Sequence, residues 1–197
     1  MASGTDLGES FESVLLAAQA GDEWAFSRLY HDMNPRLLRY FGSRAPQEAE
    51  DLSIETWLGA ARRISEFRGD YHQFRAWMFA IAHGRLVQHW RDAHRRSLVE
   101  DASADLSNVA DPDNVETGVL DGLTGLEATR EIVKALSFDQ AEVILLRVLG
   151  GFSVDEVARI CGKRAGTVRV LQHKALRRLS SSSPVLAAVN ATASVRD

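Results

Sequence analysis

The segment from Phe152 to Leu179 constrains the fold of this chain most strongly, because two short helical patterns meet there at a glycine. Ser153 and Glu156 have the spacing of a capping box, which predicts that a helix begins at Ser153. Gly162 supplies a backbone conformation that ends such a helix, and a second helical pattern follows it. Two helices joined by a short, glycine-containing turn are typical of a helix-turn-helix.

The second helix of this pair carries the strongest positive charge in the chain. Residues 162–180 hold six Lys or Arg and no acid. In a helix-turn-helix, the start of the second helix reaches base edges in the major groove and basic residues bind phosphates. The pattern assigns base contacts to Arg164, Thr167, Arg169, Val170 and His173, and phosphate contacts to Lys174, Arg177 and Arg178. A solvated basic helix in an ordinary two-helix hairpin is the alternative interpretation.

The net charge of the chain, -4 at pH 7, taken alone argues against a nucleic-acid binder. The charges are unevenly distributed, however. Residues 97–125 carry seven acids and no base, whereas residues 126–180 carry ten bases and six acids. The C-terminal block is therefore basic, as DNA binding requires.

Four helical patterns precede the acidic stretch, and residues 1–96 show no strand-like alternation. The helices are expected at 10–20, 22–41, 46–64 and 74–96, and Pro35 is expected to kink or divide the second. The sequence predicts an all-α protein with two small helical domains joined by an acidic flexible linker. The predicted parts are an N-terminal helical domain at 10–96, the linker at 97–125, a C-terminal helix-turn-helix domain at 126–180 and a flexible tail at 181–197.

Several classes of protein are disfavoured by the sequence. Cys161 is the single cysteine, so an internal disulfide is excluded, and its position on an apolar helical face predicts a buried thiol. His83, His89 and His94 fall on different helical faces, so we expect no metal and no cofactor. No catalytic signature is present, which indicates that the chain is not an enzyme. Without a signal-like start or a long apolar run, we expect a cytoplasmic protein that does not insert into a membrane.

Three segments together resemble one known family, the bacterial extracytoplasmic-function sigma factors, which direct core RNA polymerase to promoters. They are AEDLSIETWLGAARRI at 49–64, FRGDYHQFRAWMFAIAHGRL at 67–86 and GTVRVLQHKALRRL at 166–179. The resemblance covers nearly all of residues 14–180 and includes the order of helical domain, acidic linker and DNA-binding domain. The chain departs from the family pattern at Ile54, where Gln is usual, and at residues 137–138, where Leu-Pro is usual.

The resemblance implies which residues bind each partner. Docking on core polymerase, through the β′ clamp helices and the β subunit, would involve Asp51, Leu52, Glu55, Trp57 and Arg62, with core packing as the alternative for Leu52 and Trp57. The downstream (−10) promoter element would be trapped as single-stranded DNA by Phe67, Arg68, Tyr71, His72, Phe74 and Arg75. Aromatic faces beside arginines are the combination that single-strand binders use. The basic helix at 162–180 would read the upstream (−35) element, and Trp77 is assigned to the core.

The same resemblance implies an anti-sigma factor as a further partner that clamps the two domains. From its acidity, we further expect the linker to keep the free protein off DNA, and we expect the two domains to fold separately. A helix-turn-helix transcriptional regulator with a helical N-terminal sensor domain is the alternative function. Such a regulator would bind DNA without polymerase, whereas a sigma factor requires polymerase.

Overall fold

The structure is a computed structural model that describes residues 7–103 and 125–182. Most of the predicted linker and nearly all of the predicted tail therefore lie outside the described residues. The described helices are α1 (Leu7–Gln19), α2 (Glu23–Gly42), α3 (Ala49–Ala61), the 3-10 turn η1 (Ile64–Glu66), α4 (Tyr71–Ser103), α5 (Gly125–Lys134), α6 (Phe138–Val148), α7 (Val154–Ile160) and α8 (Ala165–Ser182). The described residues contain no strand, so the prediction of an all-α fold is confirmed.

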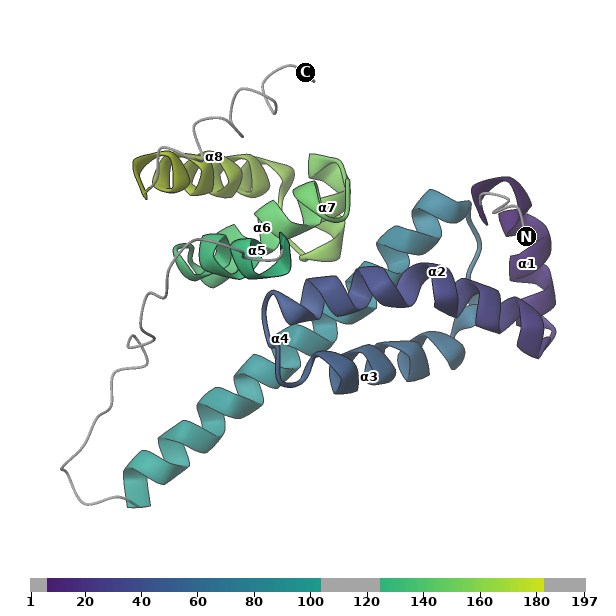
Figure 1. Ribbon diagram of the computed structural model, residues 1–197, viewed down its shortest axis with the longest axis horizontal. Helices are drawn as coiled ribbons and strands as arrows, with labels where there is room; N and C mark the ends of the chain where they lie inside the picture. The colour runs from purple at the N-terminus through teal and green to yellow at the C-terminus, as the bar shows by residue number, and fades with distance from the viewer. Residues whose placement is uncertain (1–6, 104–124, 183–197) are drawn as a thin grey trace.

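Helices α1–α4 form the N-terminal half of the molecule, in which α2 lies between α1, α3 and α4 (Figure 1). The side chain of Asp22 caps α2 by accepting a hydrogen bond from the amide of Ala25 at 3.1 Å. Pro35 does not divide α2, which is one helix from Glu23 to Gly42. The missing amide of Pro35 removes one hydrogen bond, but Met33 and Leu37 on either side are fully buried, and their packing holds the helix together.

Helix α4 begins earlier and ends later than its apolar pattern predicts. The amide of Gln73 donates to Asp70 Oδ1 at 2.8 Å, and the amide of Asp70 donates to Gln73 Oε1 at 2.9 Å. These reciprocal bonds form a capping box that starts the helix at Tyr71. At its other end α4 continues to Ser103, beyond the Arg96 at which the composition changes.

Helices α5–α8 form the C-terminal half. The capping box predicted at Ser153 and Glu156 is present, and a second one, between Ser137 and Gln140, starts α6. Gly162 has φ +62, a conformation that favours glycine, and it reverses the chain between α7 and α8. The helix-turn-helix predicted from the sequence is therefore present, with α8 as its second helix.

The two halves pack directly against each other through α4 and α7. Phe152, in the loop before α7, is fully buried, and its ring lies edge-on to Phe79 of α4 at a centroid distance of 5.2 Å. In Figure 1, α7 faces the N-terminal half while α8 lies on the far side of the C-terminal half. The structure thus shows a closed arrangement of the two halves.

Candidate nucleic-acid interface

The predicted upstream surface is the outer face of α8. Val168, Ala175 and Leu179 are buried on the opposite face, against α6 and α7. All eight residues predicted to contact DNA are exposed; they are Arg164, Thr167, Arg169, Val170, His173, Lys174, Arg177 and Arg178. No acid interrupts this stretch of sequence. The start and the outer side of α8 therefore present one continuous basic face to solvent.

The residues predicted to bind the downstream element lie between η1 and the first turns of α4. Arg68 and His72 are exposed, whereas Phe67, Tyr71 and Arg75 are half-buried. The guanidinium of Arg68 folds back and donates to the carbonyl oxygens of Ser65 and Phe67, each at 2.7 Å. This surface is less open than that of α8.

Phe74 does not belong to this surface, which corrects its predicted role in base stacking. Its side chain is fully buried, and its ring lies 5.3 Å from that of Phe11 and 5.6 Å from that of Phe67. Phe74 occupies the apolar stripe of α4, so it packs in the core and offers no face to a base. Trp77, half-buried against the same core, is placed as predicted.

Tyr71 is tied to α2 by its hydroxyl, which donates to Asp32 Oδ2 at 2.6 Å. Burial, followed by this hydrogen bond to a carboxylate, raises the pKa of Tyr71 to about 12. The ring is therefore held in a fixed orientation at the edge of the predicted downstream surface.

The C-terminal half binds two residues of this same surface. His72 Nε2 lies 2.7 Å from Glu156 Oε1, and Arg75 donates to the carbonyl oxygen of Gly150 at 2.6 Å. The Arg75 guanidinium also lies 5.6 Å from the centroid of the Phe152 ring. Desolvation opposes ionisation of Glu156, but hydrogen bonds from Ser153 and the nearby His72 outweigh it, so the pKa of Glu156 is lowered.

A buried carboxylate joins the halves at a second place. Glu142 of α6 is 1% exposed, and its Oε2 accepts a hydrogen bond from the Tyr40 hydroxyl at 2.7 Å. His83 Nδ1 lies 2.6 Å from the same oxygen. Arg44 Nε lies 3.3 Å from the other oxygen, where it forms an ion pair without hydrogen-bond geometry. We call these four residues the Glu142 cluster.

Two groups at the Glu142 cluster have a raised pKa. Burial, and then the charge of Glu142, raise the pKa of Tyr40 well above its ordinary value and that of the Cys161 thiol to about 12. Cys161 packs against the core but is half-buried, which is less than the full burial predicted from the sequence. His83, Glu142 and Cys161 bring one ligand atom each within 4.8 Å of one another, but the guanidinium of Arg44 already supplies the positive charge that faces the carboxylate.

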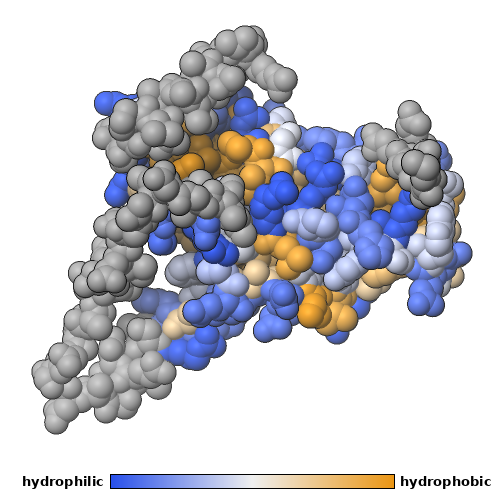
Figure 2. Space-filling model, in the orientation of Figure 1, coloured by the Kyte–Doolittle hydropathy of each residue, from blue (hydrophilic) through white to orange (hydrophobic). Residues whose placement is uncertain are grey.

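On α3, two of the residues predicted to dock on polymerase follow their alternative interpretation, which is core packing. Asp51, Glu55 and Arg62 are exposed as expected, but Leu52 and Trp57 are only 4% and 5% exposed and pack in the core. The exposed apolar residues are instead Ile54 and Leu58, at 55% and 53%. Figure 2 shows hydrophobic surface along the edge of the molecule that α3 occupies in Figure 1. Ile54 and Leu58 are four residues apart, so they lie on one helical face.

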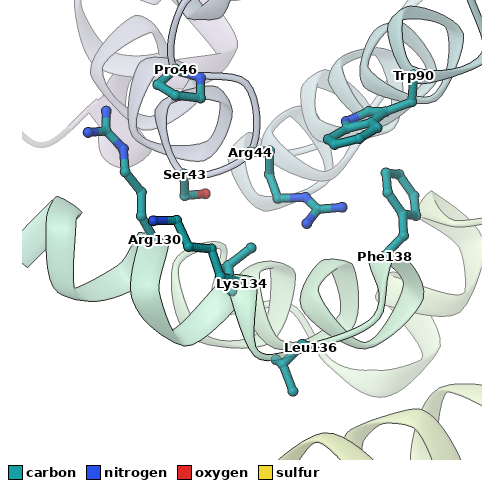
Figure 3. Close-up of a pocket in the computed structure, with 9 residues that line it drawn as sticks. Ser43, Arg44, Pro46, Trp90, Arg130, Lys134, Leu136 and Phe138 are labelled. Atoms are coloured by element: carbon teal, nitrogen blue, oxygen red, sulfur yellow. The ribbon is translucent and has the colours of Figure 1, made fainter. Parts of the chain in front are cut away.

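A pocket of about 390 Å³ lies between the two halves, where the α2–α3 turn and α4 face α5 and α6 (Figure 3). Arg44 points between the rings of Trp90 and Phe138, and its guanidinium carbon lies 4.5 Å from the Phe138 centroid. The other two cations in the wall also have acceptors, because Arg130 donates to the carbonyl of Gly42 and Lys134 pairs with Glu131. The pocket belongs to the closed arrangement and is not assigned a ligand.

Comparisons with known proteins agree with this division into two halves. The sigma-70 region 2 family matches residues 28–96, and the sigma-70 region 4 family matches residues 126–179. The ECF RNA polymerase sigma factor BldN of Streptomyces coelicolor is 36% identical over 169 residues, which are 85% of this chain and 63% of the relative. The ECF RNA polymerase sigma factor SigD of Mycobacterium tuberculosis is 31% identical over 87% of this chain and 83% of the relative.

A solved structure is also similar. The sigma factor RpoE from Bartonella quintana, crystallised with the anti-sigma factor NepR, is 25% identical with a TM-score of 0.61. The match covers 79% of this chain and 94% of that chain.

The helical fold and the two family matches together define a transcription initiation factor with a helix-turn-helix. The chain belongs to the ECF sigma factors of bacterial RNA polymerase, which recognise promoters. The alternative of a regulator with a sensor domain is not supported, because the N-terminal half matches sigma region 2. Among the described helices, none has both the length and the apolar character of a membrane span.

Proposed function

We propose that this sigma factor reads the upstream promoter element with α8. The observation that carries the proposal is the continuous exposed basic face of that helix, opposite a buried face of Val168, Ala175 and Leu179. Arg169 lies in the second turn of α8, close enough to its start to reach base edges, where arginine can hold guanine through two hydrogen bonds. Arg177 lies two turns further on and meets only phosphate.

The downstream element is captured by the exposed and half-buried residues around the start of α4. These are Phe67, Arg68, Tyr71, His72 and Arg75. Their aromatic faces stack on unpaired bases, and the two arginines attract the backbone. Stacking of one base is worth about 1–3 kcal/mol, which offsets the cost of unpairing it.

Core polymerase docks on the exposed face of α3, with the β′ clamp helices as the main contact. This face consists of Asp51, Ile54, Glu55, Leu58 and Arg62. Two apolar side chains ringed by charges resemble the core and rim of a protein interface. Leu52 and Trp57 act from the core by holding the helix in place.

The protein works in the cytoplasm, where core polymerase and promoter DNA are found. An anti-sigma factor is a further partner, because the similar sigma factor RpoE was crystallised in complex with the anti-sigma factor NepR. The three activities, namely polymerase docking, downstream capture and upstream reading, are thus assigned to α3, to the start of α4 and to α8.

The test of the upstream assignment compares Arg169→Ala with Arg177→Ala in reconstituted holoenzyme on a library of upstream elements. Arg169→Ala should lose about 1–3 kcal/mol and relax the preference at one or two positions. Arg177→Ala should weaken all sequences alike and reduce the salt dependence by about one ion. Both should bind core polymerase normally, whereas Leu58→Glu should not. If Arg169→Ala changed no base preference, the assignment of α8 would be wrong.

A further inference from the structure

The contacts between the halves cover the surface proposed to capture the downstream element. The carboxylate of Glu156 is bonded to His72 at 2.7 Å, and the carbonyl of Gly150 accepts from Arg75 at 2.6 Å. Both acceptor atoms are oxygens, like those of a DNA phosphate. The Phe152 ring lies against the Arg75 guanidinium in the position that a stacked base would take. Two of the five proposed downstream residues, His72 and Arg75, are therefore occupied by the C-terminal half.

The Glu142 cluster explains what holds this cover in place. Glu142 is almost fully buried in the C-terminal half, yet Tyr40, Arg44 and His83, its hydrogen-bonding and ion-pairing partners among the described residues, all belong to the N-terminal half. A buried carboxylate that loses such partners is strongly destabilised. In the closed arrangement these charges are paired, and removal of the Glu142 charge would leave the Arg44 guanidinium, whose side chain is 6% exposed, buried without its counter-ion. The closed arrangement therefore depends on this ion pair.

We propose that the free sigma factor is autoinhibited by its own C-terminal half, with the Glu142 cluster as the latch and the Gly150–Glu156 segment as the cover. In this state the protein cannot capture single-stranded DNA, and the halves must separate before it can. The inference rests on the proposed downstream function of residues 67–75. It requires nothing of the acidic stretch at 104–124, because all of its contacts lie within the described residues.

The first measurement is the radius of gyration of the full-length protein by small-angle X-ray scattering. Glu142→Gln removes the charge of the latch and keeps the size of the side chain, so the radius should increase. Glu131→Gln is the matched control, because Glu131 is an exposed residue of the same half whose ion pair, within the described part of the chain, is with Lys134. The radius of this variant should equal that of the wild type. An unchanged radius for Glu142→Gln would overturn the latch.

The second measurement is the affinity of the same proteins for a fluorescent pool of short single-stranded DNA, without polymerase. Glu142→Gln should bind at least about tenfold more tightly than the wild type, and Glu131→Gln should not differ from it. Glu156→Gln should bind more tightly without opening the halves fully, because glutamine keeps the capping box but loses the charge that pairs with His72. A larger radius with unchanged affinity would overturn the cover.

Two further variants keep the test decisive. If Glu142→Gln fails to fold, Tyr40→Phe removes one donor to the latch from the N-terminal half while filling the same space, and it should produce the same two changes. Holoenzyme carrying Arg68→Ala tests the downstream function separately, because Arg68 makes no described contact with the C-terminal half. Normal promoter melting by that holoenzyme would count against the downstream function itself, whereas an unchanged radius counts against autoinhibition alone.

Discussion

The two candidate DNA surfaces of this sigma factor are in opposite states. The face of α8 is exposed along its whole length, whereas the surface at the start of α4 is partly covered by the loop before α7. The difference follows from their chemistry. Lysines and arginines on a helix are well hydrated, so α8 is stable in water as it stands. Aromatic rings and half-buried cations are poorly hydrated. Arg75 and its neighbours are therefore stabilised by packing and by hydrogen-bond acceptors, which another part of the chain can supply.

Removal of the Phe152 ring, which covers the surface at the start of α4, should have the largest effect on the difference in exposure between the two DNA surfaces. Phe152→Ala deletes a fully buried ring that contacts Phe79 and lies beside Arg75. Loss of such a side chain typically costs about 3–5 kcal/mol. Denaturant unfolding of the full chain should show a destabilisation of that size, together with tighter binding of single-stranded DNA.

Val148→Ala serves as the control for Phe152→Ala, because Val148 of α6 is 70% exposed. Its effect on unfolding should stay within about 0.5 kcal/mol, as for other surface substitutions. Equal effects of the two variants would show that the loop before α7 contributes nothing to the closed arrangement.

An alkaline titration should reveal the tie between Tyr71 and Asp32 on the covered surface. The folded pKa of Tyr71 is raised from 10.0 to about 12, so its contribution to stability is fully present below pH 10 and is lost as the pH rises to about 12. Because the side chain is only half-buried, we expect only about 1 kcal/mol after screening. The difference in unfolding free energy between the wild type and Tyr71→Phe should shrink over this range, and a constant difference would contradict the assignment.

The smallest expected effect is at Glu156. Its folded pKa lies below the ordinary value of 4.5, so its contribution to stability is present above pH 4.5 and is lost as the pH falls through the lowered value. Unfolding of Glu156→Gln should depend less on pH in this acidic range than unfolding of the wild type.

The sequence predicts the local features of this molecule well. Capping boxes at Ser137 and Ser153 and the turn at Gly162 depend on residues at most a few positions apart, and all three are present. The capping box between Asp70 and Gln73 has equally local causes, so the early start of α4 could have been predicted. That Pro35 does not divide α2 has a tertiary cause, since the packing on both sides of it is not visible in the local pattern.

The faces and the interface could not be predicted in the same way. Apolar residues occur all around α3, so periodicity alone does not show that Leu52 and Trp57 are buried while Ile54 and Leu58 are exposed. The partners of Glu142 are separated from it by many residues in the sequence. Tyr40 precedes it by 102 residues, and nothing local indicates that a glutamate in an apolar helix will be paired across the molecule.

The long separation within the Glu142 cluster also sets an order of events during synthesis. Glu142 follows His83 by 59 residues. At roughly 5–20 residues per second, the ribosome needs on the order of 3–12 seconds to add that segment. During this interval the start of α4 in the N-terminal half is uncovered, because the C-terminal half has not yet been synthesised. A nascent sigma factor therefore passes through a stage in which this surface is accessible to polymerase and DNA.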